Sequence, residues 1–219
     1  MPLNDSSRSN SKTLLRSFFA GAGLCLLWPI ILVSLPLARY STGASGIFRQ
    51  QRIGLKGKEY TVYKLRTMMP SVAGNSTVTV SGDSRITRLG AFFRHTKIDE
   101  LPQLWNVILG DMSIVGPRPD VAGYADTLVG DASRILLLRP GITGPAAIKY
   151  SQEEKLLAES SDPELYNKLV IYPDKTKLNL EYHDTWSLYM DIRLIFMTIH
   201  MLPRSKKLLL PVSGENVVD

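Results

Sequence analysis

The feature that most constrains the fold is an uncharged apolar segment near the N-terminus, residues 17–38 (SFFAGAGLCLLWPIILVSLPLA). At about 1.5 Å per residue, a straight helix of this length would reach about 33 Å, close to the thickness of a bilayer core. One transmembrane helix is therefore the plain interpretation. Pro29 lies near the middle, however, where proline removes a backbone hydrogen bond and kinks a helix, and Pro36 adds a second break.

Basic residues flank the apolar segment on both sides. They are Arg8, Lys12 and Arg16 before it and Arg39, Arg49 and Arg52 after it. Because lysine and arginine beside a membrane segment favour the cytoplasmic side, a spanning helix would leave one cluster outside. A helix that enters the bilayer, bends at Pro29 and returns leaves both clusters inside. We therefore favour a re-entrant helix over a full span, which stays the alternative.

A secretory signal peptide is a third interpretation of this segment, because TGA at residues 42–44 could pass for a cleavage site. The apolar run is longer than the ~7–15 residues of a signal-peptide core, and proline interrupts it. We favour this interpretation least.

Composition narrows the function classes. The chain of 219 residues carries a net charge of +6, which suits nucleic acid, anionic lipid or a phosphorylated substrate without choosing between them. Cys25 is the only cysteine, so a disulfide framework and a cysteine zinc cage are excluded. The three histidines show no metal-ligand spacing.

The pattern beyond the apolar segment predicts a small hairpin and short helices. Residues 46–68 are rich in strand formers on both sides of GLKG, which predicts a β-hairpin. Residues 70–84 are small and polar and predict a loop. Residues 85–96 and 101–109 have apolar side chains at helical spacing. Pro102 fits the second of these helices only in its first turn, where N–H groups have no partner.

The C-terminal part predicts further helices. Residues 151–175 are charged and predicted helical, with breaks at Pro163 and Pro173. Residues 181–202 predict one amphipathic helix, for which packing in the core and lying in the membrane interface are equally good explanations. The sequence thus predicts an α+β fold, mainly helical with a small β-hairpin, and an N-terminal re-entrant membrane helix bent at Pro29.

Two adjacent acids, Asp99 and Glu100, stand where the helix at 101–109 is expected to begin. Helix capping, worth about 1 kcal/mol, would explain them without any chemistry. A helix N-terminus also suits phosphate, and an ionised carboxylate can act as a nucleophile. Two acids can share such work, because one attacks while the other helps hold Mg²⁺ or handles a proton. Both explanations stay open at this point.

Arg118 is the first of four candidate phosphate-binding residues. Pro117 and Pro119 fix the backbone on both sides, and a guanidinium matches phosphate oxygens with two parallel hydrogen bonds. A surface arginine in a turn is the alternative.

The other three candidates are Arg139, Lys64 and Arg66. Arg139 is followed by proline and glycine, in a sequence similar to that around Arg118. Lys64 and Arg66 should share one face of a predicted strand. Solvated surface charges are the alternative for all three. Acids, cations and a membrane segment in one short chain suggest chemistry on a diphosphate at a membrane surface.

Three stretches carry a resemblance to a known family. YKLRTM, KIDELPQLWNVILGDMSIVGPRP and RPGITG closely resemble the bacterial sugar transferases, the monotopic phosphoglycosyl transferases. The resemblance runs from about residue 14 to residue 202. Its long DELPQL…GDMS…GPRP signature is specific, and the chain matches the small form of the family.

The resemblance implies a reaction. Members transfer a sugar-1-phosphate from a nucleotide diphosphosugar, usually a UDP-sugar, to a polyprenol phosphate such as undecaprenyl phosphate, which begins a surface polysaccharide or glycoconjugate. It implies that Asp99 is the nucleophile that forms a phosphosugar-enzyme and releases UMP. Glu100 would be its partner in holding Mg²⁺ or handling a proton, and Arg118 would hold phosphate. Lys64, Arg66 and Arg139 would be further basic residues of the site.

The resemblance also implies a place in the cell and a domain plan. It implies a chain in the bacterial inner membrane with its catalytic domain on the cytoplasmic face, in contact with membrane lipids. We expect a flexible tail at 1–13, the re-entrant helix at 14–40, the catalytic domain at 41–202 and a C-terminal tail at 203–219. The oligomeric state is not fixed, and a homodimer is left open.

Three departures from the family pattern bear on these expectations. Trp28 precedes the bend proline, Pro29, where the family often has serine, so the bend could rest on Pro29 alone. Pro145 follows RPGITG where the family often has tryptophan, which puts that contact with sugar or membrane in doubt. Residues 151–175 look longer than compact members need and could shape sugar selection.

Two functions outside this family were weighed. A non-catalytic basic membrane adaptor would explain the charge and the apolar segment, but not the spacing of Asp99, Glu100 and Arg118. A nucleic-acid binder is disfavoured, because the chain has no recognisable binding module and its basic residues are scattered.

Overall fold

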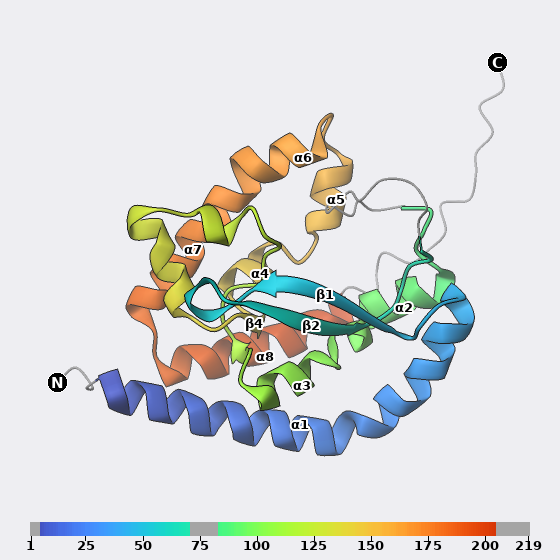
Figure 1. The fold of residues 1–219 in the computed structure, drawn as a ribbon, viewed down its shortest axis with the longest axis horizontal. Helices are drawn as coiled ribbons and strands as arrows, with labels where there is room; N and C mark the ends of the chain where they lie inside the picture. The colour runs from blue at the N-terminus through green and yellow to red at the C-terminus, as the bar shows by residue number, and fades with distance from the viewer. Residues whose placement is uncertain (1–4, 71–82, 205–219) are drawn as a thin grey trace.

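The computed structural model describes residues 5–70 and 83–204 of the chain. Most of the loop predicted at 70–84 and nearly all of the predicted C-terminal tail lie outside these residues. The described part is mainly helical, as the sequence predicts, and has two small two-stranded sheets, of which one is the predicted hairpin. Figure 1 shows a long N-terminal helix running beneath a hairpin and a set of shorter helices.

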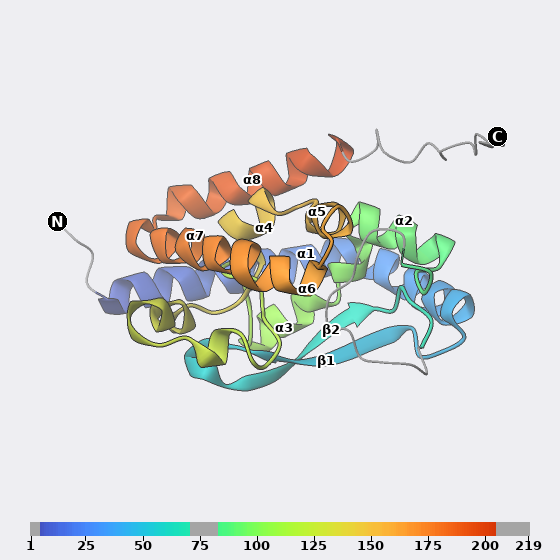
Figure 2. The same ribbon diagram turned by 90° about the horizontal axis from the view of Figure 1, so that it is seen from above.

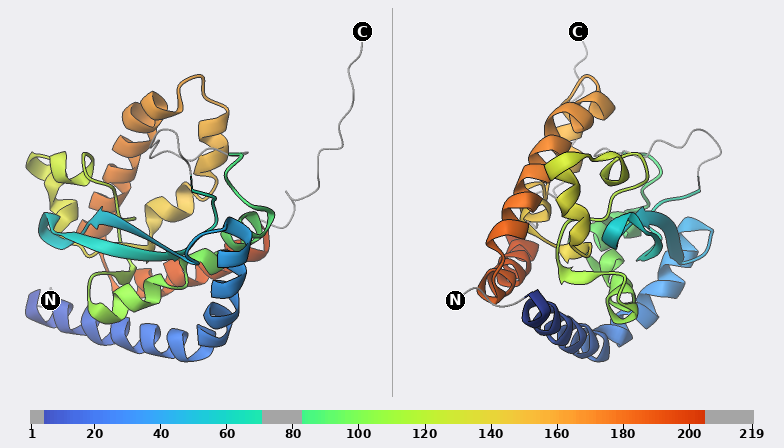
Figure 3. Two further views of the ribbon diagram at one scale, coloured as in Figure 1. Left: turned by 45° about the vertical axis from the view of Figure 1, so that its right-hand side comes forward. Right: turned by 60° about the vertical axis from the view of Figure 1, so that its left-hand side comes forward.

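The first helix, α1 (Asp5–Thr42), is one continuous element that contains Pro29 and Pro36. It begins before the predicted boundary at residue 14, so residues 5–13 are helical in place of the loose tail expected there. Figures 1 and 3 show that α1 bends partway along its length, for which a proline inside a helix is the usual cause. Residues Ala20–Thr42 are long and apolar enough to cross a membrane, and little of this stretch is buried.

The hairpin predicted at 46–68 is confirmed. Strands β1 (Ile47–Ile53) and β2 (Glu59–Leu65) pair antiparallel, and the short helix η1 (Leu55–Gly57) forms the turn. Helix α2 (Arg88–Thr96) confirms the helix expected at 85–96, and the Thr87 side chain caps it by accepting from the N–H of Gly90.

The acid pair lies just before helix α3. Asp99 and Glu100 belong to one turn of 3₁₀ helix, η2 (Ile98–Glu100), and α3 (Gln103–Leu109) begins three residues after Glu100. The expectation that Pro102 lies in the first turn of one helix from residue 101 is therefore wrong by a small margin. Pro102 is the N-cap of α3, a position that needs no N–H from it.

Asn106 ties α3 to the hairpin. Its side chain is fully buried, accepts a hydrogen bond from the N–H of Tyr63 at 3.1 Å and donates to the carbonyl of Thr61 at 2.7 Å. One side-chain amide thus satisfies two backbone groups of β2 that no neighbouring strand satisfies. A buried cluster of Ala20, Val62, Val107 and Met112 packs α1, β2 and α3 together.

Two turns that contain glycine, GPRP at residues 116–119 and RPGITG at residues 139–144, interlock through close contact of their backbones. Strands β3 (Ser113–Val115) and β4 (Gly141–Thr143) pair in parallel, an element that the sequence did not reveal. The N–H of Gly141 donates to the carbonyl of Pro117 at 2.7 Å. A Cβ on Gly116 or Gly141 would collide with backbone of the other turn. The stretches GPRP and RPGITG therefore form one packed unit, and this unit holds Arg118 in place.

The C-terminal half is a series of helices on one side of the hairpin (Figure 2). Short 3₁₀ helices, η3 (Ala125–Thr127) and η4 (Gly130–Leu137), precede β4. The remaining helices are α4 (Pro145–Lys149), α5 (Glu153–Ala158), α6 (Pro163–Tyr166), the π-helical segment η5 (Asn167–Ile171), α7 (Tyr172–Thr185) and α8 (Leu188–Arg204).

Two helix boundaries differ from the predictions. The break at Pro163 is confirmed, but the helical backbone continues through Pro173, because this proline occupies the first turn of α7 after a π-helical segment. The single helix predicted at 181–202 is wrong. Trp186 is extended and ends α7, and the Ser187 hydroxyl accepts from the N–H of Met190 at the start of α8.

The interlocked turns generate a prediction about stability. We expect Gly141→Ala to lower the free energy of unfolding by roughly 1–3 kcal/mol or more, because the new methyl group overpacks against rigid backbone. Thermal unfolding in detergent measures this change. Gly21→Ala, in α1, is the control, since no atom beyond the nearby backbone of its own helix lies within 4 Å of the added Cβ. Equal melting temperatures for the two variants would contradict the proposed interlock.

Candidate active site

Asp99 and Glu100 form the centre of the site, in the turn between α2 and α3. The turn is possible because Lys97 adopts a left-handed conformation (φ 59°) that ends α2. Both acids are nearly buried, with 8% and 7% of their surface exposed. Burial of two adjacent carboxylates is costly unless cations or hydrogen bonds compensate.

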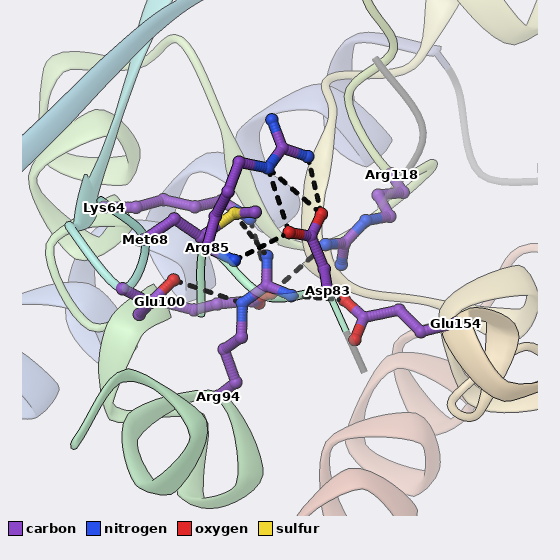
Figure 4. A network of polar contacts seen from close by, with 9 residues as sticks. Lys64, Met68, Asp83, Arg85, Arg94, Glu100, Arg118 and Glu154 are labelled. Atoms are coloured by element: carbon purple, nitrogen blue, oxygen red, sulfur yellow. Dashed lines mark hydrogen bonds and ion pairs between the residues drawn. The ribbon is translucent and has the colours of Figure 1, made fainter. Parts of the chain in front are cut away.

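Two cations compensate for the burial of the Glu100 carboxylate. Its Oε1 lies 3.5 Å from Nζ of Lys64, on β2, and 3.3 Å from Nη2 of Arg118, in the GPRP turn (Figure 4). Burial alone would raise the pKa of Glu100, but the charges of Lys64 and Arg118, with help from Lys97, lower it well below its usual range. Glu100 is therefore held ionised.

The burial of the Asp99 carboxylate is not compensated in the same way. Its Oδ1 is buried and has no hydrogen-bond partner among the described residues. Burial, followed by the charge of Glu100, raises the pKa of Asp99 to about 6, against the opposing charges of Lys64, Lys97 and Arg94. At neutral pH this acid is an ionised carboxylate with few partners, so its oxygen is free to bind or react.

The two cations differ in their surroundings. Burial lowers the pKa of Lys64 to about 8. The charge of Arg118 lowers this pKa further, whereas the charge of Glu100 raises it. Lys64 therefore depends on Glu100 to stay protonated. Glu100 raises the pKa of Arg118 further. The Arg118 side chain is 42% exposed while it contacts Glu100. It can therefore reach an incoming anion.

The structure brings together four of the six predicted catalytic and phosphate-binding residues: Asp99, Glu100, Lys64 and Arg118. Arg66 lies just past β2, where it donates to the carbonyl of Ser45 at 2.8 Å and its guanidinium lies over the ring of Phe48. Arg139 donates to the carbonyl of Gly110 at 2.9 Å. Each of these two arginines therefore binds a backbone carbonyl.

Two arginines near the site were not among the sequence candidates. Arg52 was counted only as a flank of the apolar segment, yet its Nη1 donates to the carbonyl of Pro119 at 3.1 Å, next to Arg118. Arg94 reaches the site from α2, where its charge lowers the pKa of Asp99. Arg94 could have been noticed from its place five residues before Asp99, but no sequence signal pairs Arg52 with a turn 67 residues away.

The sequence predicts that the two carboxylates hold Mg²⁺. No group of three or more acidic, histidine or cysteine side chains that could hold a metal occurs among the described residues. Mg²⁺ is commonly held by one or two carboxylates plus substrate phosphates, and the unpartnered buried Oδ1 of Asp99 is a suitable ligand. Asp99 and Glu100 therefore fit a magnesium ion that shares its coordination with a substrate.

Comparison with known proteins gives one family. Residues 7–205 match the family model described as bacterial sugar transferase. A UDP-glucose:undecaprenyl-phosphate glucose-1-phosphate transferase of Xanthomonas campestris pv. campestris is 34% identical over 193 residues, which are 86% of this chain and 38% of that protein.

Two shorter relatives are similar over most of their length. The uncharacterized sugar transferase EpsL of Bacillus subtilis is 33% identical over 80% of this chain and 79% of its own length. The exopolysaccharide production protein ExoY of Rhizobium meliloti is 31% identical over 82% of this chain and 80% of its own length. The chain thus spans less than half of the Xanthomonas protein and about four fifths of the shorter ones.

The uncompensated burial of Asp99 generates a prediction. We expect Asp99→Asn to raise the free energy of unfolding at pH 8 by roughly 1–3 kcal/mol, because it removes a carboxylate that is ionised in both states and penalised in the folded one. Near pH 3 and below, the acid is mostly protonated in both states, so the gain should vanish there. Chemical unfolding in EDTA at both pH values measures it.

The control for this prediction is Asp131→Asn, because the Asp131 side chain is 74% exposed. This variant should show no comparable gain at pH 8. Loss of stability in Asp99→Asn at pH 8 would mean that Asp99 is a structural partner, contrary to the geometry described above.

Proposed function

The chain belongs to the bacterial sugar transferase family, and we propose that it transfers a sugar-1-phosphate from a UDP-sugar to undecaprenyl phosphate. The observation that carries this proposal is the unequal environment of the acid pair. Glu100 is occupied by two cations, whereas the neighbouring Asp99 keeps a buried carboxylate oxygen without a hydrogen-bond partner. Such a pair suits one acid that attacks phosphorus and one that organises charge around it.

The reaction would proceed in two displacements at one phosphorus atom. A carboxylate oxygen of Asp99 attacks the phosphorus that bears the sugar, and the bond between that phosphorus and the bridging oxygen breaks, releasing UMP. An oxygen of undecaprenyl phosphate then attacks the same phosphorus. This second step forms the lipid-linked diphosphosugar and returns the Asp99 carboxylate.

Lys64 and Arg118 would bind the phosphate oxygens during both displacements. Their positive charges lie beside Glu100, which keeps Lys64 protonated near neutral pH despite its burial. Arg118, partly exposed, can form two parallel hydrogen bonds to a phosphate. When bound to the acid pair, Mg²⁺ would neutralise part of the diphosphate charge.

The names of the relatives support the donor and acceptor classes. The Xanthomonas relative is named for UDP-glucose and undecaprenyl phosphate, and the Rhizobium relative for exopolysaccharide production. We propose the same classes of donor and acceptor for this chain, in the initiation of a surface polysaccharide or glycoconjugate, and leave the sugar unassigned.

We further propose that α1 enters the cytoplasmic face of the inner membrane and returns to the same face. Its exposed apolar side chains would face lipid. Exposed apolar side chains also occur on α3 and α8, and they include Trp105, Ile108 and Leu109 on α3 and Leu188, Tyr189, Ile192, Phe196 and Ile199 on α8. Leu104 and Val107 of α3 point into the core instead. One side of α3 would therefore pack against the core, while its other side would contact the membrane.

The transferase proposal is tested by UMP release. We expect purified protein with Mg²⁺ and undecaprenyl phosphate to release UMP from at least one member of a panel of UDP-sugars. Asp99→Asn should reduce turnover by roughly 10³-fold or more, because the nucleophile is removed. Asp131→Asn is the control and should retain activity.

Full turnover in Asp99→Asn would show that the nucleophile is misassigned. Lipid binding without Mg²⁺-dependent UMP release from any sugar would favour the non-catalytic membrane adaptor.

The membrane proposal is tested by cysteine labelling. In a Cys25→Ser background, we expect cysteines introduced at positions 5 and 45 to react with a membrane-impermeant reagent from the same side, because a re-entrant helix returns both ends to one face. The wild-type chain, whose Cys25 lies inside the apolar segment, is the control and should label slowly. Labelling of positions 5 and 45 from opposite sides would indicate a spanning helix.

A further inference from the structure

Helix α5 carries two acids in its first turn, Glu153 and Glu154, close to the site. Acids in this position are often explained by the helix dipole, but α5 has only six residues and the expected gain is a few tenths of a kcal/mol. The contacts of these acids give a more specific explanation, because each of them meets a cation that belongs to another element.

The first of these contacts crosses from α5 to α2. Oε1 of Glu154 lies 2.7 Å from Nη1 of Arg94, as Figure 4 shows beside the ion pairs of Glu100. In the second contact, Oε1 of Glu153 lies 2.7 Å from Nζ of Lys175, on α7. Glu153 is also near enough to Arg118 to raise its pKa, after the larger effect of Glu100. The start of α5 therefore lies beside the cations of the site.

Arg94 is held in a defined position by its remaining contacts. Its Nε donates to the hydroxyl of Thr67 at 3.1 Å, and its Nη2 lies 3.7 Å from the sulfur of Met68. These contacts fix one edge of the guanidinium and leave Nη1 to Glu154. Helix α2 packs against the turn η2 that carries the acid pair, and the charge of Arg94 acts on Asp99, so this guanidinium lies near the acid pair.

We propose that Arg94 is a further phosphate-binding residue and that Glu154 competes with the diphosphate of the donor for its guanidinium. This inference rests on the proposed function, since it takes a nucleotide diphosphosugar as the donor. The diphosphate would lie between Arg94 and Arg118, next to the acid pair. Binding of the donor would then release α5 from α2.

The strengths of the two interactions favour this exchange. The Glu154 side chain is 48% exposed and that of Arg94 is 25% exposed, and exposed ion pairs contribute only about 0–1 kcal/mol. The donor's diphosphate carries two negative charges against the single charge of Glu154, and its oxygens can form charge-assisted hydrogen bonds to arginine. Glu154 is therefore a weak competitor, able to lower donor affinity by a small factor without preventing binding.

Calorimetric binding of UDP to the full chain in detergent with Mg²⁺ tests the inference, because UDP carries the diphosphate without the unassigned sugar. We expect Glu154→Gln to lower the Kd for UDP about two- to fivefold, the factor that corresponds to an exposed ion pair. Arg94→Gln should raise the Kd roughly tenfold, through loss of a charge-assisted contact. Arg94→Lys should lie between wild type and Arg94→Gln.

The double variant makes the test specific. In an Arg94→Gln background, Glu154→Gln should leave the Kd unchanged, because the guanidinium for which Glu154 and the diphosphate compete is no longer there. Glu159→Gln is the matched control, since it removes the same charge from the exposed C-terminal end of α5. Its Kd should equal that of the wild type. Glu154 is exposed, so Glu154→Gln carries the test even where Arg94→Gln unfolds.

Two results would overturn the inference while leaving the proposed function intact. One is UDP binding with the same Kd in wild type and Glu154→Gln. The other is an equal decrease of the Kd in Glu154→Gln and Glu159→Gln, which would indicate a general effect of charge. Absence of UDP binding by the wild type would overturn the proposed donor class and this inference together.

Discussion

The carboxylate of Glu100, shared between Lys64 and Arg118, is the interaction on which the site depends. It keeps two cations together in a nearly buried place, and those cations keep Glu100 ionised in return. Because both are engaged by Glu100, Asp99 is left with an unpartnered buried oxygen beside them. One ion-paired acid therefore creates both the positive field and the free carboxylate that phosphoryl transfer would need.

Distant parts of the chain are brought to this carboxylate by two backbone devices. Asn106 connects α3 to β2 and so places Lys64 above the turn that carries the acid pair. The interlocked glycines of GPRP and RPGITG place Arg118, with Arg52 holding the next carbonyl. Both devices use buried backbone hydrogen bonds, and a polar group that lost its partner there would be costly.

Local pattern was enough to predict much of this arrangement. The hairpin, α2, the acid pair near a helix start, and Lys64 and Arg118 as its cations follow from periodicity, turn residues and the family resemblance. The parallel pairing of β3 with β4, the contacts of Arg94 with α5 and the break at Trp186 do not, because each depends on tertiary contacts between segments far apart or on one residue in an extended conformation. Arg66 and Arg139 show the reverse case. Strand alternation predicted phosphate binding for Arg66 and the Arg-Pro-Gly sequence predicted it for Arg139, but each of them donates to a backbone carbonyl.

The central claim is that the two adjacent acids have different tasks, and it is tested most directly by locating the covalent intermediate. Protein incubated with Mg²⁺ and a UDP-sugar that supports UMP release, without lipid acceptor, should accumulate a sugar phosphate adduct. Peptide fragmentation by tandem mass spectrometry should place the added mass on Asp99. An adduct on Glu100, or stoichiometric UMP release with no adduct on either acid, would contradict the account.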